Sequence, residues 1–190
     1  QFNALPWHDS TAAVAINRVR LHRAIANASQ QLGISGPLVA LVSNPCAWPY
    51  LAGLPIQRLV YLRLDDYPRL PGVDADMIRP LERRMVERSD LIVVTARQLA
   101  PCGGAPVAYL PQGVDVDHFS STSFGPRKEK VLGFFGLLAE WVDWDLVMGV
   151  ARLCSDWTLE FVGPVRYRPD SLADLPNVRL RDGVPYSELP

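Results

Sequence analysis

The chain has 190 residues, of which 48% are apolar and 21% charged, and its formal net charge is −1 at pH 7. These proportions are ordinary for a folded globular protein and exclude a disordered one, and the length suffices for one medium domain or two small ones. The near-neutral charge gives no electrostatic reason to expect nucleic acid as a partner.

The spacing of the cysteines bears on the redox compartment of the protein and on whether it binds a metal. Cys46, Cys102 and Cys154 lie far apart, and none forms a Cys-x-x-Cys pair. This spacing argues against a zinc site and against a disulfide framework, and it favours small buried thiols in a reducing cytosol. The three histidines are equally scattered, so we expect no metal. No apolar run approaches the ~18 residues that a membrane-spanning helix needs.

The chain begins with a helical pattern followed by an apolar run. Ser10 is an N-cap candidate for a helix over 11–31, which Gly33 and the Gly36-Pro37 pair end. The continuous apolar run Leu38–Val42 predicts a strand buried on both faces.

The same alternation continues to residue 110. Strands are predicted over 58–64, 90–95 and 106–110, with a helix over 77–89 between the first two. Alternating helices and apolar strands imply a parallel sheet with helices on both faces, which is a Rossmann-like α/β architecture.

A Ser-rich and then charged segment over 119–130 is a predicted linker, after which the alternation restarts. The predicted elements are strands over 130–135, 158–162 and 178–180 and a helix over 143–153. We therefore expect one domain over 1–118 and the first part of another over 131–190. A Rossmann domain needs roughly 100–150 residues, and the first unit lacks an opening strand and helix before Thr11. Both units are thus expected to be incomplete, and the chain to be part of a longer protein.

Five segments in order carry a family resemblance. They are Arg88–Thr95, then Leu110-Pro111-Gln112-Gly113-Val114-Asp115 with Phe119, then Val131–Gly136 with Trp141–Trp144, then Phe161–Pro164, and last Leu175–Val178 with Pro185–Pro190. Together they resemble the retaining nucleotide-sugar glycosyltransferases with two Rossmann-like domains (GT-B fold, group 1 or family 4), in the bacterial subgroup that builds cell-surface polysaccharide. Gln112 stands where that family usually has Asn.

The resemblance implies a hexosyltransferase that moves a sugar from a nucleotide diphosphate sugar to a cell-surface glycan or a lipid-linked acceptor. The first unit would hold the acceptor and the second the donor, with no cofactor and no metal. In relatives a pair of glutamates later in the donor domain binds the sugar and ribose. We expect that pair beyond Pro190, and this chain alone to be inactive. The location implied is cytoplasmic, with peripheral contact at the inner face of the membrane.

The resemblance places the donor site at Gly136, Leu137, Glu140 and Gly163. A glycine at the first turn after a strand lets backbone N–H groups approach a diphosphate, and the next helix N-terminus adds a favourable dipole. The alternative is a glycine that only makes a tight turn. Many relatives carry Arg and Lys after this glycine, whereas the segment from Gly136 to Asp143 has no basic residue. Glu140 would then touch the sugar or the acceptor, and Asp143 is expected to cap the following helix.

The acceptor side is expected at the ends of the earlier strands. Asp65 and Asp66 follow one strand and are the candidate catalytic carboxylates, because such positions face the cleft of an open α/β sheet. Adjacent carboxylates also raise one another's pKa. The alternative is that Asp66 only starts the turn at Pro68. Trp48 and Thr95 are candidates for the cleft rim, with packing of a loop as the alternative for Trp48.

A predicted helix carries four arginines, Arg79, Arg83, Arg84 and Arg88, interspersed with Glu82 and Glu87. A solvated face with ion pairs is favoured over a membrane-binding face. Two other functions stay open on the same fold: a nucleotide-sugar 2-epimerase, and a non-catalytic relative that binds a glycan or a nucleotide. A plain NAD-dependent enzyme is disfavoured, because no Gly-x-Gly-x-x-Gly segment follows a strand.

Overall fold

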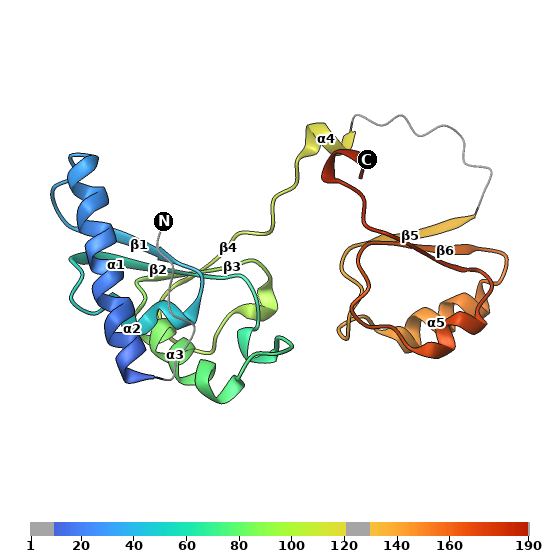
Figure 1. Ribbon diagram of the computed structural model, residues 1–190, viewed down its shortest axis with the longest axis horizontal. Helices are drawn as coiled ribbons and strands as arrows, with labels where there is room; N and C mark the ends of the chain where they lie inside the picture. The colour runs from blue at the N-terminus through green and yellow to red at the C-terminus, as the bar shows by residue number, and fades with distance from the viewer. Residues whose placement is uncertain (1–9, 121–129, 190) are drawn as a thin grey trace. The chain divides into compact units, whose positions relative to one another are not determined.

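The computed structural model describes residues 10–120 and 130–189, and the chain divides into two units, Gln1–Gly113 and Val114–Pro190. Each unit is built on its own parallel sheet, of four strands in the first and three in the second (Figure 1). The prediction of an α/β protein with two Rossmann-like parallel sheets is confirmed in this form. Within the described ranges, no helix is both long enough and apolar enough to cross a bilayer.

The first unit alternates strands with helices in chain order. Its elements are α1 (Thr11–Gln31), β1 (Leu38–Val42), η1 (Pro45–Ala47), α2 (Trp48–Leu51), β2 (Ile56–Arg63), η2 (Tyr67–Arg69), α3 (Ala75–Arg88), β3 (Leu91–Val94), η3 (Arg97–Leu99) and β4 (Val107–Tyr109). Ser10 caps α1 as predicted, its side chain accepting from the Ala13 N–H. The helix predicted from residue 77 begins earlier, because the Asp74 side chain accepts from the Met77 N–H at 3.1 Å and so caps α3.

The second unit contains α4 (Val116–Ser120), β5 (Val131–Phe135), α5 (Trp144–Leu153), β6 (Thr158–Val162), η4 (Asp170–Asp174), β7 (Val178–Arg181) and η5 (Tyr186–Glu188). Asp143 caps α5, since its carboxylate accepts from the Leu146 N–H at 2.9 Å, and this part of the sequence prediction is confirmed. At the other end of α5, the Asn177 side-chain amide donates to the carbonyls of Ala151 and Trp157, each at 3.0 Å. This amide ties the helix end to the start of β6 and of β7.

The boundary between the units differs from the predicted one. It was expected after His118, whereas the structure places it after Gly113, with α4 in the second unit. The reason is local contact: the His118 ring stacks on Tyr186 of η5 at 4.6 Å between centroids, and Phe119 meets the same ring edge-on. The predicted linker over 119–130 lies mostly outside the described residues.

The strand order explains a second difference. The orders are β1-β2-β3-β4 and β5-β6-β7, so within each sheet every strand after the first pairs with the strand before it. Right-handed crossovers that always step in one direction across a sheet put their helices on the same face. Accordingly, α2 and α3 cover one face of the first sheet, and α5 covers one face of the second (Figure 1). The prediction of helices on both faces, and of a β1 buried on both faces, is therefore wrong: Val39 and Leu41 are 68% and 67% exposed.

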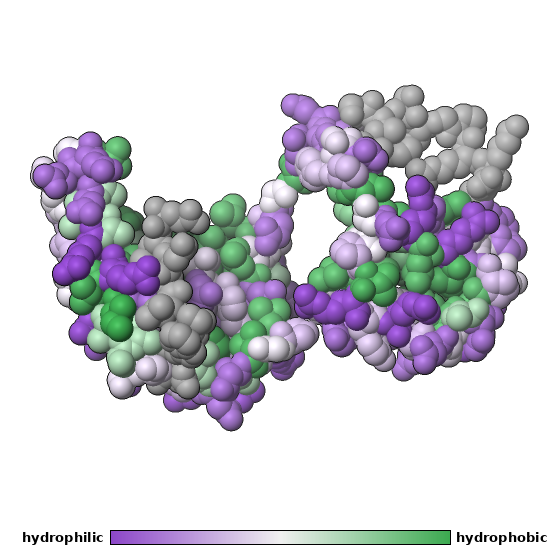
Figure 2. Space-filling model, in the orientation of Figure 1, coloured by the Kyte–Doolittle hydropathy of each residue, from purple (hydrophilic) through white to green (hydrophobic). Residues whose placement is uncertain are grey.

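Each sheet has its own core on the covered face. The first unit buries Leu59, Tyr61, Met85, Ile92 and Val94, and the second buries Leu138, Trp144, Ala151, Leu159, Phe161 and Leu172. Alternate strand residues point to the other face, as the exposed Val39 and Leu41 of β1 do. Hydrophobic side chains are visible on the surface of both units (Figure 2).

Candidate functional site

The carboxyl ends of β5 and β6 carry two glycine turns that contact each other. Gly136 follows β5 and donates its N–H to the Val162 carbonyl, while Gly163 follows β6 and donates to the Arg181 carbonyl, both at 3.0 Å. Their φ angles are 147° and 150°, a region that favours glycine. A Cβ atom on Gly163 would lie 2.0 Å from the Gly136 carbonyl oxygen. Close approach of the two turns thus accounts for Gly163 without any ligand.

The loop after Gly136 is held by the loop after Gly163. The Leu138 N–H donates to the Pro164 carbonyl at 2.9 Å, and the Leu138 carbonyl accepts from the Arg166 N–H at 2.7 Å. The N–H groups of Gly136 and Leu138 are therefore engaged inside the protein rather than presented to a diphosphate. Leu137 is half-buried and Glu140 is exposed, so both lie at the accessible side of this loop.

Arg166 is a residue that sequence reasoning missed. The expected basic residues are absent from the segment after Gly136, but the backbone hydrogen bond to Leu138 brings Arg166 beside that segment. In the sequence, Arg166 was visible only as an arginine that follows the Phe161–Pro164 motif. Finding its position required the pairing of the two loops, which periodicity does not reveal.

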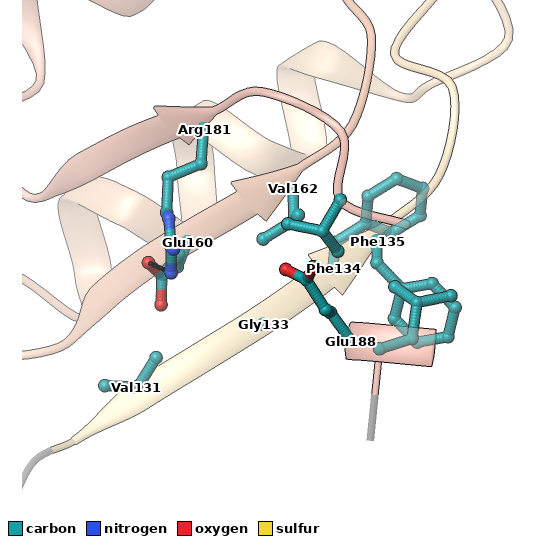
Figure 3. A pocket seen from close by; sticks show the side chains of 10 residues that line it. Val131, Gly133, Phe134, Phe135, Glu160, Val162, Arg181 and Glu188 are labelled. Carbon is teal, nitrogen blue, oxygen red and sulfur yellow. Dashed lines mark hydrogen bonds and ion pairs between the residues drawn. The ribbon is translucent and has the colours of Figure 1, made fainter. Parts of the chain in front are cut away.

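A pocket of about 450 Å³ lies on the open face of the second sheet (Figure 3). Its walls include Phe135, Val162 and Arg181, which end the three strands, so the pocket reaches the carboxyl edge of the sheet. Gly133 in β5 leaves space at its floor, because no atom of the described residues lies within 4 Å of a Cβ built there. The lining mixes apolar side chains with the ion pair between Glu160 and Arg181, whose atoms lie 3.1 Å apart.

Glu188 of η5 brings a second carboxylate to the rim of this pocket, close to Phe135 and Val162 (Figure 3). The pocket can therefore hold a small molecule that offers apolar surface together with hydrogen-bonding groups. It lies beside the turns of Gly136 and Gly163 rather than within them.

In the first unit, the carboxyl ends of β2 and β3 bring Asp65, Asp66 and Thr95 to one edge. The Thr95 hydroxyl donates to the Leu64 carbonyl at 3.1 Å, and the Asp66 N–H donates to the Asp65 carboxylate at 2.8 Å. The Asp66 carboxylate pairs with Arg69 at 3.2 Å. These contacts give Asp66 a part in the turn at η2, while Asp65 is the more exposed carboxylate of the two.

A buried network behind this edge was also missed. Glu82 of α3 accepts from the Tyr61 hydroxyl at 2.8 Å and from the Arg63 Nε at 2.9 Å. Arg63 also donates to the Leu99 carbonyl at 2.5 Å and lies 3.9 Å from the Asp66 carboxylate. The network connects α3 and η3 to the end of β2, just before the loop that carries Asp65 and Asp66.

Because of this network, we expect the first unit to lose stability at alkaline pH. Burial, reinforced by the hydrogen bond to Glu82, raises the pKa of Tyr61 far above its usual value. Because the folded-state pKa lies above the unfolded one, the stability contributed by the protonated hydroxyl is present below about pH 10 and is lost as the pH rises further. We expect the free energy of unfolding to fall above about pH 10, and to fall less steeply in Tyr61→Phe than in the exposed Tyr109→Phe control. Equal slopes in urea titrations from pH 8 to 11 would contradict this.

The structure places Trp48 away from the expected cleft rim. It opens α2, packs against the core of the first unit, and lines a groove with Ile56 at the amino end of β2. Among the described residues, no group of three or more His, Cys, Asp or Glu side chains is placed to hold a metal ion.

The fold thus defines an α/β protein whose glycine turns and candidate polar side chains lie at the carboxyl ends of parallel strands. No protein-family model matches the chain, and no curated protein matches it.

Proposed function

We propose that this chain belongs to a retaining glycosyltransferase of the two-Rossmann-domain type, which transfers a sugar from a nucleotide diphosphate sugar to a cell-surface glycan or lipid-linked acceptor. The observation that carries the proposal is the pair of glycine turns at the carboxyl ends of β5 and β6, with Arg166 beside them. Ligands of open α/β sheets bind at these ends of the strands.

In the proposed site, the donor lies at the carboxyl edge of the second sheet. Arg166 supplies the positive charge that the segment after Gly136 lacks, and it favours the leaving diphosphate electrostatically. Glu140 is exposed and contacts the sugar or the acceptor. Asp65, with Thr95 close to its loop, is the proposed acceptor contact in the first unit. The Glu82–Arg63 pair contributes to the acceptor side only by fixing the end of β2 in place, and it does not contact the acceptor.

A second candidate is a non-catalytic relative that binds a nucleotide or a glycan. It is favoured by the engagement of the Gly136 and Leu138 N–H groups, which removes two donors from a diphosphate site. Both candidates place a ligand at the same edge, so transfer of the sugar to an acceptor, or binding of a glycan in place of a nucleotide sugar, distinguishes them.

Binding of donors to a protein extended beyond residue 190, so that it includes the expected glutamate pair, tests the proposal without requiring turnover. Saturation-transfer NMR with UDP-glucose, GDP-mannose, ADP-glucose and dTDP-glucose is expected to identify one bound donor. Arg166→Gln should weaken that donor about tenfold, the loss expected for one charge-assisted contact. Arg168→Gln is the matched control, because Arg168 lines a different groove with Leu172 and Leu180.

Two results would contradict the proposal. One is the absence of binding by any donor to a chain whose spectrum shows it folded. The other is an equal loss of affinity in Arg166→Gln and Arg168→Gln, which would mean a general effect of positive charge. Binding of a free glycan without any nucleotide sugar would favour the non-catalytic candidate.

A further inference from the structure

The first unit contains a groove far from the carboxyl edge of its sheet. It lies between α2 and the end of α3, has a volume of about 570 Å³, and is floored by Ile56 and Leu59 of β2. Trp48 of α2 forms one wall, and Arg84 and Arg88 of α3 form the opposite wall. Nothing in the proposed glycosyl transfer uses these residues.

The charge on the α3 wall is not neutralised by the helix itself. Glu82 turns into the protein and pairs with Arg63, so it is not available to the outer face. Within the described part of the chain, Arg79 is the arginine of α3 that has an ion pair, with Asp76 at 3.7 Å. Arg84 and Arg88 are exposed as expected, but among the described residues they form no ion pair, and they lie one helical turn apart on the groove side.

Asp90 also reaches the groove, but its carboxylate is already engaged. It accepts from the Leu59 N–H at 2.8 Å and from Arg58 at 3.0 Å. The Leu59 hydrogen bond and the Arg58 charge hold the pKa of Asp90 below its usual range. Arg84 and Arg88, which have no ion pair with any described residue, thus line a groove with an apolar floor and an indole, and the Asp90 carboxylate at its margin pairs with Arg58.

Compensation of the helix dipole accounts for only part of this arrangement. A cation in the last turn of a helix is favourable, and Arg88 is the last residue of α3. Arg84 lies a full turn earlier, where the dipole effect has fallen off. Its place over an apolar groove needs another explanation.

We propose that this groove binds a small organic anion with an aromatic or alkyl body. The body lies against Trp48 and Ile56, and a carboxylate or phosphate lies between Arg84 and Arg88. The volume is that of a site for one small molecule, and guanidinium groups match the geometry of carboxylate and phosphate oxygens. A concave groove with an apolar floor fits such a solute better than the flat surface of a bilayer. The inference does not depend on the proposed donor site.

The test uses 1-naphthyl phosphate and 1-naphthoate as probes on the 190-residue chain. We expect both to shift the Trp48 indole N–H signal in ¹H–¹⁵N spectra, assigned with Trp48→Phe, and to bind measurably by calorimetry. Arg84→Gln should weaken 1-naphthyl phosphate about tenfold, whereas Arg83→Gln, exposed on the same helix and outside the groove, should leave it unchanged. Ala52→Leu fills the groove without changing charge and should also weaken binding.

Several outcomes would overturn the inference. Inorganic phosphate binding as tightly as 1-naphthyl phosphate would show that the apolar floor contributes nothing. Equal losses in Arg84→Gln and Arg83→Gln would show a non-specific attraction to the helix. Binding of phosphatidylglycerol vesicles with no binding of either naphthyl probe would mean a membrane surface instead. Absence of any Trp48 shift at millimolar probe would exclude the site.

Discussion

Glu82→Ala is expected to destabilise the first unit by about 3–5 kcal/mol, the cost of removing one partner from a buried ion pair. The substitution removes the carboxylate that lies 2.9 Å from the Arg63 side chain, which is only 14% exposed, and leaves it the more distant Asp66 at 3.9 Å. It also leaves the fully buried Tyr61 hydroxyl without its acceptor. An unpaired buried charge costs far more than the pair contributes. The effect should therefore exceed that of deleting any surface ion pair in the chain.

Urea unfolding combined with amide hydrogen exchange measures this loss and locates it. Exchange should accelerate in β2 and β3, which flank the network, and should not change in β5–β7. Glu87→Ala is the matched control, because Glu87 is exposed on the same helix. A Glu82→Ala protein as stable as Glu87→Ala would show that Glu82 does not hold Arg63.

Gly163→Ala is expected to destabilise the second unit by about 2–6 kcal/mol. Backbone strain at a positive φ contributes ~1–3 kcal/mol and overpacking a further ~1–3 kcal/mol. The added Cβ would lie 2.0 Å from the Gly136 carbonyl oxygen, and that neighbour is backbone that cannot rotate away. The two turns would have to separate, which breaks the hydrogen bond from Gly136 to Val162.

Substitutions at two other glycines distinguish the effect of backbone strain from the effect of the steric clash. Gly136→Ala carries the positive φ, but among the described residues its Cβ would meet only the Phe134 ring, at 3.4 Å, so a loss of about 1–3 kcal/mol is expected. The Cβ of Gly133→Ala would meet no atom within 4 Å in the part of the chain that the structure describes, so this change should be close to neutral. Urea unfolding followed by tryptophan fluorescence gives the order, because Trp141, Trp144 and Trp157 all lie in this unit. A Gly163→Ala protein as stable as Gly133→Ala would contradict the close approach of the turns.

Local signals in the sequence predicted most elements well. The cap at Ser10 and the apolar run Leu38–Val42 gave α1 and β1 with their observed bounds, because both depend on short-range chemistry. Asp143 was recognised as a helix cap for the same reason. The four-residue α2, from Trp48 to Leu51, was missed because it is too short to show a period.

What could not be predicted depends on contacts between distant segments. Glu82 lies among charged residues and was expected on the solvated face. In the structure it is buried instead, because it accepts hydrogen bonds from Tyr61 and Arg63 of β2. Arg166 reaches the Gly136 loop only through strand pairing. The open faces follow from strand order, which hydrophobic periodicity does not encode.

The uninterrupted strand order also bears on how the chain acquires its structure. Since within each sheet every strand after the first joins the one that precedes it, each pairing closes only a single crossover loop and keeps the contact order low for parallel sheets. Within each sheet, assembly can therefore begin at one parallel crossover between neighbouring strands and extend strand by strand in the direction of synthesis. Fraying would run the opposite way, starting at β4, a three-residue edge strand whose residues are all exposed.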